Sequence, residues 1–170
     1  MKTKLLLLIL LVTKVIFINA QMDEKFYFPS KTLQQIEWAN QKEVKFAVEN
    51  DTINAVILKP MKEAKATVFY FHGAGGNLTS YAPLLTPLLK DNFQVILVDY
   101  RRYEKSTGTP THKNIATDGE KVFTEISQMD GIINTKKIIY GASIGTQIAA
   151  HLAKNHESEI SGLVLEGTMA

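Results

Sequence analysis

The 170-residue sequence contains no cysteine, which excludes disulfides, thiolate metal sites and thiol nucleophiles. It also lacks internal repeats and low-complexity segments. Hydrophobic residues make up 45% and charged residues 21%, which is ordinary for one globular domain and excludes a disordered chain. The absence of disulfides is compatible with export, because a domain with a large core does not need them.

Long hydrophobic runs are also absent, except at the N-terminus. Lys2 and Lys4 precede the run 5–12, and Ala20 provides a small residue at a cleavage point. This pattern predicts a signal peptide at 1–20, followed by the domain at 21–170, and export to the periplasm or the cell exterior.

An uncleaved anchor that associates with the membrane is the alternative reading of this N-terminus. The hydrophobic stretch 5–18 contains Lys14 and is shorter than the roughly 20 residues that span a bilayer, which favours cleavage. Neither sign of charge dominates the rest of the chain. Removal of the three leader lysines leaves 16 basic and 17 acidic residues, so no nucleic-acid partner is indicated.

The domain alternates strand and helix patterns. Hydrophobic residues alternate with polar or small ones in 44–48 and 53–57 around the turn Asn50-Asp51, which predicts an antiparallel hairpin at a sheet edge. The segments 66–71, 93–98, 138–140 and 163–165 read as strands, and the first two are hydrophobic on both faces, as in a helix-covered parallel sheet.

Helices are expected between these strands. One spans 78–89 and becomes regular at about Pro83, and another spans 115–129 with Asn114 or Thr117 as its cap. Together the patterns predict a mostly parallel, three-layer α/β domain whose ligands bind beyond the carboxyl ends of the strands. The lead-in at 21–40 is expected to be irregular and to lay its aromatic residues on the domain, and its function is unreadable.

The segment IIYGASIGTQIAAHLA (138–153) changes its hydrophobic period at Ser143, from a short strand run to a helical spacing of four. Gly141 and Gly145 flank the serine in the pattern G-x-S-x-G. These glycines lack Cβ atoms that would collide where strand and helix fold back on each other. The pattern predicts a nucleophile elbow, and the alternative is that Ser143 only caps the helix.

A glycine-rich turn, HGAGGN at 72–77, follows the strand 66–71. A dinucleotide fingerprint would need glycine where Leu78 stands, which disfavours phosphate binding. The other chemistry is an oxyanion hole, with the backbone N–H groups of Ala74 and Ile144 as its donors. Loss of one such donor typically costs about 3 to 4 kcal/mol of transition-state stabilisation.

FHGAGGN, VDYRRYEKSTGTP, GASIG and LVLEGTMA together resemble the α/β-hydrolase superfamily. More narrowly, they resemble its exported or membrane-associated serine hydrolases related to prolyl oligopeptidases and α/β-hydrolase-domain depalmitoylases. In that branch a DYRGYGxSxGxP segment closes the fourth strand, and here Arg102 and Glu104 replace its two glycines. The resemblance covers about 26–170 and implies a three-layer α/β-hydrolase fold that is truncated after the sixth strand.

The resemblance implies a serine hydrolase that cleaves an ester, thioester or amide bond through an acyl-enzyme at Ser143. Its substrate would be a small molecule, a lipid acyl group or a peptide, and no metal or cofactor is expected. The family order is Ser, acid, His, and no histidine follows at the required position before Ala170. We therefore expect the acid and histidine beyond Ala170 and an inactive 170-residue piece.

The alternative function is a non-catalytic α/β-hydrolase-like binding domain or an inactive truncated product. The oligomeric state stays open.

The remaining polar residues have structural interpretations. The resemblance implies that His72 braces the oxyanion turn and that Asp99 and Arg101 fix the loop after the fourth strand. Glu166 is an alternative triad acid, since some hydrolases place it after the sixth strand. The other expectations are a core-edge position for His151, solvated side chains for His112 and His156, and favourable interactions of Asp118 and Glu120 with a helix dipole.

Overall fold

The structure is a computed structural model that describes residues 26–167. The signal peptide predicted at 1–20 therefore lies outside the described residues. Within 26–167, none of the helices combines the length and hydrophobicity that a membrane span requires.

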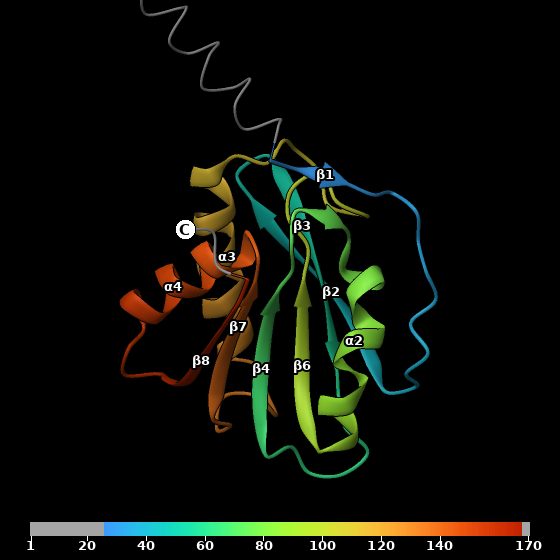
Figure 1. Cartoon of the computed structure of the whole chain (residues 1–170). Coiled ribbons are helices and arrows are strands. Elements are labelled where there is room, and N and C mark those ends of the chain that lie inside the picture. Colours follow the sequence, from blue (N-terminus) through green and yellow to red (C-terminus); the bar gives the residue numbers. More distant parts are fainter. Residues whose placement is uncertain (1–25, 168–170) are drawn as a thin grey trace, which may run out of the picture.

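A six-stranded sheet forms the middle layer, with the strand order β2-β3-β6-β4-β7-β8 (Figure 1). Its strands are β2 (Gln41–Val48), β3 (Asp51–Leu58), β4 (Ala66–Phe71), β6 (Phe93–Val98), β7 (Lys137–Ala142) and β8 (Ile160–Glu166). The hairpin β2–β3 is antiparallel and lies at one edge, and β3 joins β6 in antiparallel fashion. The pairs β6–β4, β4–β7 and β7–β8 are parallel. The predicted mostly parallel sheet with an antiparallel edge hairpin is confirmed.

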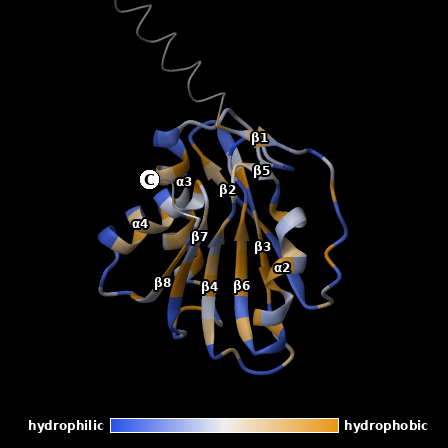
Figure 2. Cartoon of the chain, in the orientation of Figure 1, coloured by the Kyte–Doolittle hydropathy of each residue, from blue (hydrophilic) through white to orange (hydrophobic). Residues whose placement is uncertain are grey.

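Helices cover both faces of this sheet. Helix α2 (Leu78–Lys90) lies on one face, and α3 (His112–Ser127) and α4 (Gly145–Asn155) lie on the other (Figure 1). Hydrophobic residues follow the central strands, and hydrophilic residues gather in the loops and on the outer surface of α4 (Figure 2). This is the three-layer arrangement that the alternating strand and helix patterns predict.

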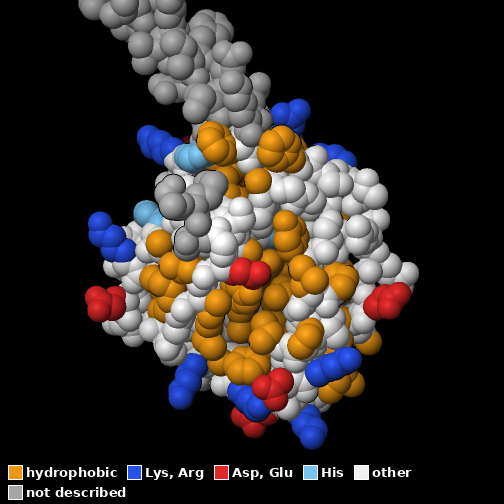
Figure 3. Space-filling view, in the orientation of Figure 1, with side chains coloured by type: hydrophobic (Ala, Val, Ile, Leu, Met, Phe, Trp, Pro, Cys, Tyr) orange, Lys and Arg blue, Asp and Glu red, His pale blue; other side chains and the backbone are white. Residues whose placement is uncertain are grey.

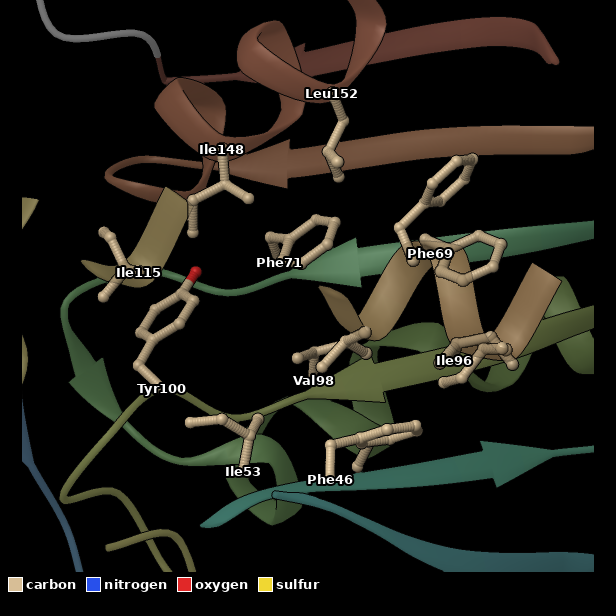
Figure 4. Packing of buried hydrophobic residues seen from close by; sticks show 14 of the residues in the cluster. Phe46, Ile53, Phe69, Phe71, Ile96, Val98, Tyr100, Ile115, Ile148 and Leu152 are labelled. Carbon is tan, nitrogen blue, oxygen red and sulfur yellow. The ribbon is translucent and has the colours of Figure 1, made fainter. Parts of the chain in front are cut away.

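The sheet separates two hydrophobic cores. Phe69 and Phe71 of β4 pack toward Ile148 and Leu152 of α4 (Figure 4), whereas Tyr70 of the same strand packs toward α2. Successive side chains of a strand point to opposite faces, so a strand between two helix layers must be hydrophobic throughout. All six residues of β4 are buried.

Helix α2 begins earlier than predicted. It starts at Leu78, five residues before Pro83, because the Asn77 side chain accepts hydrogen bonds from the backbone N–H groups of Thr79 and Ser80. Pro83 and Pro87 both lie inside the helix. The cap supplies the acceptor that starts the helix, and buried residues on its inner face hold it against the sheet.

The cap predicted for α3 is also wrong. The N-cap is Thr111, whose side chain accepts from the Asn114 N–H, while the Asn114 side chain accepts from the Thr111 N–H. This reciprocal pair is a capping box, and the helix starts at His112, three residues before the predicted start at 115. Thr117 instead donates its hydroxyl to the Asn114 carbonyl inside the helix.

The described residues pair β8 on one side only, with β7. Leu163, Val164 and Leu165 of this edge strand are 42–43% exposed. Hydrophobic side chains also gather on the sheet face between α2 and β8 (Figure 3), where Tyr70 and Tyr140 line a surface pocket of about 450 Å³.

Candidate active site

Ser143 lies in a sharp bend between β7 and α4. Its φ is 52°, which is the left-handed region that non-glycine residues rarely adopt. Its side chain is exposed, although Ala142 before it is half-buried and Ile144 after it is buried. A strained, exposed serine between a buried strand and a helix is the geometry of a nucleophile elbow.

The two glycines around Ser143 occupy positions with no room for a side chain. A Cβ placed on Gly145 would lie 2.0 Å from the Phe71 carbonyl oxygen, and one on Gly141 would lie 2.4 Å from the Gly145 carbonyl oxygen. Both neighbours are backbone atoms, which a side-chain rotation cannot move away. Gly141 and Gly145 therefore both require glycine, for the steric reason that the G-x-S-x-G pattern predicts.

The Ser143 side chain does not cap α4. The N-cap position is Ile144, and no side chain makes a cap hydrogen bond there. The Ser143 carbonyl accepts instead from the N–H and the hydroxyl of Thr146, and the Ser143 N–H donates to the Glu166 carbonyl over 2.8 Å. Hydrogen bonds to the Ser143 backbone thus hold the bend on both sides. The Ser143 hydroxyl makes no cap hydrogen bond with α4.

The glycine-rich turn faces Ser143. A Cβ placed on Gly73 would lie 3.6 Å from the Ser143 Cβ, an ordinary van der Waals separation that puts Gly73 next to the serine. Its tighter contact, at 3.0 Å, would be with the Tyr81 hydroxyl. Within residues 26–167, the N–H groups of Ala74 and Ile144 donate no hydrogen bond. Two unused backbone donors from separate turns are what an oxyanion hole requires.

Tyrosine hydroxyls hold the carbonyls of this turn. Tyr103 donates to the Ala74 carbonyl, and Tyr81 donates to the Gly75 carbonyl over 3.0 Å. The short strand β1 (Phe28–Pro29) runs parallel to β5 (Gly75–Gly76), and the Phe28 N–H donates to the Ala74 carbonyl over 2.9 Å. The lead-in therefore pairs with the turn. The sequence predicted that its aromatic residues lie on the domain, but it did not indicate this partner, which lies 46 or more positions away.

His72 is fully buried behind the turn. Its Nε2 donates to the Asp99 Oδ1 over 3.0 Å, and its Nδ1 lies 2.6 Å from the Gly73 carbonyl oxygen. The ring also stacks on Tyr81, with centroids 5.2 Å apart. Because the Gly73 carbonyl belongs to the same planar peptide as the Ala74 N–H, this contact orients the expected oxyanion donor. His72 is thus in a bracing position and not beside Ser143 as a base.

Asp99 and Arg101 connect the loop after β6 to the rest of the domain. The Asp99 Oδ1 also accepts from the N–H of Leu78, the first residue of α2, over 2.7 Å. Arg101 donates to both oxygens of Asp118 and, through its Nη1, to Asp51 in the hairpin. Asp118 therefore serves an ion pair, where the sequence suggested only an interaction with a helix dipole.

The other histidines lie away from the serine. His112 is half-buried against the rings of Phe26 and Tyr27. His156 contacts Glu120 and Glu159, and burial lowers its pKa less than these two carboxylates raise it. The expectation of solvated side chains was wrong for both, because each packs against a distant segment. His151 is half-exposed and contacts Asn155 and Glu120. Residues 26–167 contain no cluster of three or more His, Asp or Glu side chains that could hold a metal.

Glu166 ends β8 beside the elbow. Its exposed carboxylate accepts from the Tyr140 hydroxyl over 2.5 Å, and this hydrogen bond, with burial, raises the pKa of Tyr140 to about 12. Its backbone carbonyl holds Ser143, as described above.

Comparisons with known proteins agree with this architecture. A sequence model described as the alpha/beta hydrolase fold matches residues 66–170. The chain is 32% identical over 107 residues to protein bem46 of Schizosaccharomyces pombe, covering 62% of this chain and 36% of that protein. It is also 32% identical over 111 residues to human protein ABHD12B, covering 62% of this chain and 30% of that protein.

A solved structure of an esterase from Pyrococcus furiosus superposes with a TM-score of 0.68 at 18% identity, covering 85% of this chain and 56% of that one. This likeness concerns the fold. The chain thus spans less than two fifths of the length of the two curated relatives and somewhat more than half of this esterase.

Proposed function

This chain belongs to the α/β hydrolase fold family, and from that premise we propose that it is the nucleophile-bearing part of a serine hydrolase. The proposed reaction cleaves an ester, thioester or amide bond through an acyl-enzyme at Ser143. Small-molecule, lipid-acyl and peptide substrates all contain such bonds.

One observation carries the proposal: Ser143 is held in a left-handed bend next to Gly73 of a glycine-rich turn, and the N–H groups of Ala74 and Ile144 donate no hydrogen bond within residues 26–167. A serine that only shaped the chain would not need the left-handed conformation, which costs about 1 kcal/mol or more for a residue with a Cβ. Strain of this kind gathers at functional sites, although turn residues such as Glu49 and Asn92 share it, so the position next to the glycine-rich turn adds the necessary support.

In the proposed first step, the Ser143 Oγ attacks the substrate's carbonyl carbon and its proton passes to a histidine base. The carbonyl oxygen becomes negative and accepts hydrogen bonds from the N–H groups of Ala74 and Ile144. The intermediate collapses, the bond to the leaving group breaks, and the leaving alcohol, thiol or amine takes the proton. Water then hydrolyses the acyl-enzyme by the same sequence.

The base and its acid partner are proposed to come from segments outside this chain. His72 already contacts Asp99 and the Gly73 carbonyl, and His151 and His156 contact carboxylates of the α3–α4 layer. The curated relatives that match are more than twice as long as the matched region, so they have room for these residues.

A fluorophosphonate probe tests the proposal on the full-length protein. We expect wild-type protein to be labelled and Ser143→Ala to lose labelling completely, because the probe bonds only to an activated serine. Ser158→Ala is the matched control, since Ser158 is an exposed serine in another turn. Folded wild-type protein that resists labelling would contradict the proposal and favour a binding domain.

We also propose that the protein is exported, with cleavage after Ala20. Lys2, Lys4 and the hydrophobic run 5–12 support this proposal. The intact mass of protein isolated from the source cells measures it: a chain that begins at Gln21 is expected. A chain that retains residues 1–20 and fractionates with membranes would support the anchored alternative.

A further inference from the structure

Asp99 has one carboxylate oxygen with two donors and one with none. Its Oδ1 accepts from His72 and from the Leu78 N–H, whereas its Oδ2 is buried without a hydrogen-bond partner among the described residues. A buried, unpartnered carboxylate oxygen is costly, so a donor is expected beside it.

The neighbour that contacts Asp99 is Glu104. Its side chain is 3% exposed, and both acids contact Asn54: the Asp99 N–H donates to the Asn54 carbonyl over 3.0 Å, and the Asn54 side chain donates to Glu104 Oε2 over 3.2 Å. A proton on Glu104 would give Asp99 Oδ2 the donor that it lacks. Burial, followed by the proximity of the Asp99 carboxyl group, raises the pKa of Glu104 to about 7. Glu104 also lines a surface pocket of about 280 Å³, which gives the proton a route to solvent.

The backbone at Glu104 is left-handed, with φ at 39°. Glycine would adopt this conformation without strain, and glycine stands here in the resembling hydrolases. The same is true of Arg102, whose φ is 70° but whose side chain is exposed. Of these two departures, only Glu104 directs its side chain into the buried network behind the turn.

We propose that Glu104 is a positioning residue whose protonated carboxyl donates a hydrogen bond to Asp99 and thereby fixes His72 and the Gly73–Ala74 peptide. The chain of contacts runs from Glu104 through Asp99 and His72 to the Gly73 carbonyl. It ends at the peptide that carries the Ala74 N–H. This inference rests on the proposed function, in which that N–H stabilises the oxyanion.

Charged groups from several elements surround Glu104. The acidic side is Asp99, with His72 behind it. The Nζ of Lys105 lies 3.8 Å from Glu104 Oε1, and Lys105 also pairs with Glu43 of β2. Lys31 donates to the Glu104 backbone carbonyl. The Asn54 side chain also donates to Glu104 Oε2 over 3.2 Å. Lys105 and Asn54 favour the ionised carboxylate, and Asp99 favours the protonated acid.

The direction of the pH effect follows from these contacts. Folding raises the pKa of this carboxyl from 4.5 to about 7, so the folded protein retains a proton that the unfolded chain releases. The stability from this proton is fully present below pH 4.5 and is lost as the pH rises through about 7. The turn is therefore braced best on the acid side of neutrality.

NMR of full-length protein labelled with ¹³C at the glutamate carboxyl tests the first step without any need for activity. We expect one carboxyl signal, absent from Glu104→Gln, to titrate near pH 7, and the amide signals of Gly73 and Ala74 to move with it. Lys105→Met should shift this titration to higher pH, because it removes the cation that favours the carboxylate. Titration near the ordinary carboxyl value, or turn amides that do not respond, would overturn the proposal.

The rate of fluorophosphonate labelling tests the second step. Glu104→Gln keeps a donor for Asp99 and cannot ionise, so the ratio of wild-type to Glu104→Gln rates should fall about tenfold between pH 6 and pH 8.5. Comparing the two proteins at each pH cancels the titration of the catalytic base. Glu104→Gly should be slow at both pH values, although its backbone is unstrained.

Arg102→Gly is the matched control for the change to glycine. It makes the same change at the other left-handed position and should keep the wild-type pH profile. A rate ratio that does not change with pH would overturn the proposal. If neither wild type nor any variant is labelled, the proposed function is overturned instead. The NMR result then decides the role of Glu104.

Discussion

The two turns that meet at Ser143 are held by different forces. The elbow after β7 is shaped by steric exclusion, since Cβ atoms at Gly141 and Gly145 would overlap backbone atoms at 2.4 Å and 2.0 Å. The glycine-rich turn after β4 is held by hydrogen bonds from Tyr81, Tyr103 and the His72–Asp99 pair. A Cβ on its Gly75 would meet nothing within 4 Å, whereas Gly76, with a φ of 76°, keeps a conformation that favours glycine.

This difference shows two ways in which a sequence can determine the geometry of a turn. A tight turn tolerates only glycine at its contact points, so a sequence pattern reveals it. A turn that distant side chains hold can accept other residue types at a position such as Gly75, and its geometry depends on partners that the local sequence does not name. Substitutions in the elbow should therefore act on folding, and those around the glycine-rich turn should act mainly on the reactivity of Ser143.

The largest effect is expected from Gly145→Ala. Its methyl group would overlap the Phe71 carbonyl, and relief would require β4 and α4 to separate, so we expect a loss of more than about 3 kcal/mol in the free energy of unfolding, or no folding. Gly75→Ala is the matched control in the other turn and should change stability by less than about 0.5 kcal/mol. Chemical denaturation followed by circular dichroism measures both, and equal effects would break the comparison.

A smaller effect is expected from Tyr103→Phe, which removes one donor from the Ala74 carbonyl and leaves the Phe28 N–H as the other. The free energy of unfolding should fall by about 1 kcal/mol, and fluorophosphonate labelling should slow by several-fold. Tyr140→Phe is the control, because its hydroxyl donates to the exposed Glu166 side chain and not to the turn. If Tyr103→Phe lowered stability and left the labelling rate unchanged, the turn would not depend on this hydrogen bond.

The smallest effect, of opposite sign, is expected from Ser143→Gly. Glycine adopts a φ of 52° without strain, and the gain is partly offset by its greater freedom in the unfolded chain, so stability should rise by up to about 1 kcal/mol. Ser143→Ala keeps a Cβ and should stay within about 0.5 kcal/mol of wild type. Thermal unfolding of the two variants compares them directly; a destabilised Ser143→Gly would show that the elbow is not strained.

Much of the fold was predictable because periodicity reports burial. The strand segments 66–71 and 93–98 are hydrophobic on both faces, and both lie in the middle of the sheet. The starts of α2 and α3 were misplaced, since each depends on a particular side chain, Asn77 or Thr111, that caps earlier than the hydrophobic pattern begins. A cap needs only one residue, which periodicity does not detect.

Some parts of the candidate site were also predictable from the sequence, and others were not. Ser143 and the glycines beside it were predicted from a pattern of five residues, and the glycine-rich turn from its composition. The contacts of Tyr103 and Phe28 with that turn were not predicted, because they join segments 29 and 46 positions apart in the chain. The proposed pairing of Glu104 with Asp99 was missed for a related reason: only burial would make two nearby carboxyls share a proton.

The sequence by itself determined the order of strands and helices, the hydrophobic faces and the elbow at Ser143, since each follows from the size, polarity and spacing of neighbouring residues. Only the tertiary structure decided what surrounds that serine: which carbonyls are held, which backbone donors stay unused and which carboxyl faces Asp99. The physical reason is that hydrogen bonds and protonation depend on distances and burial, and these exist only once the sheet brings the carboxyl ends of β4, β6 and β7 together.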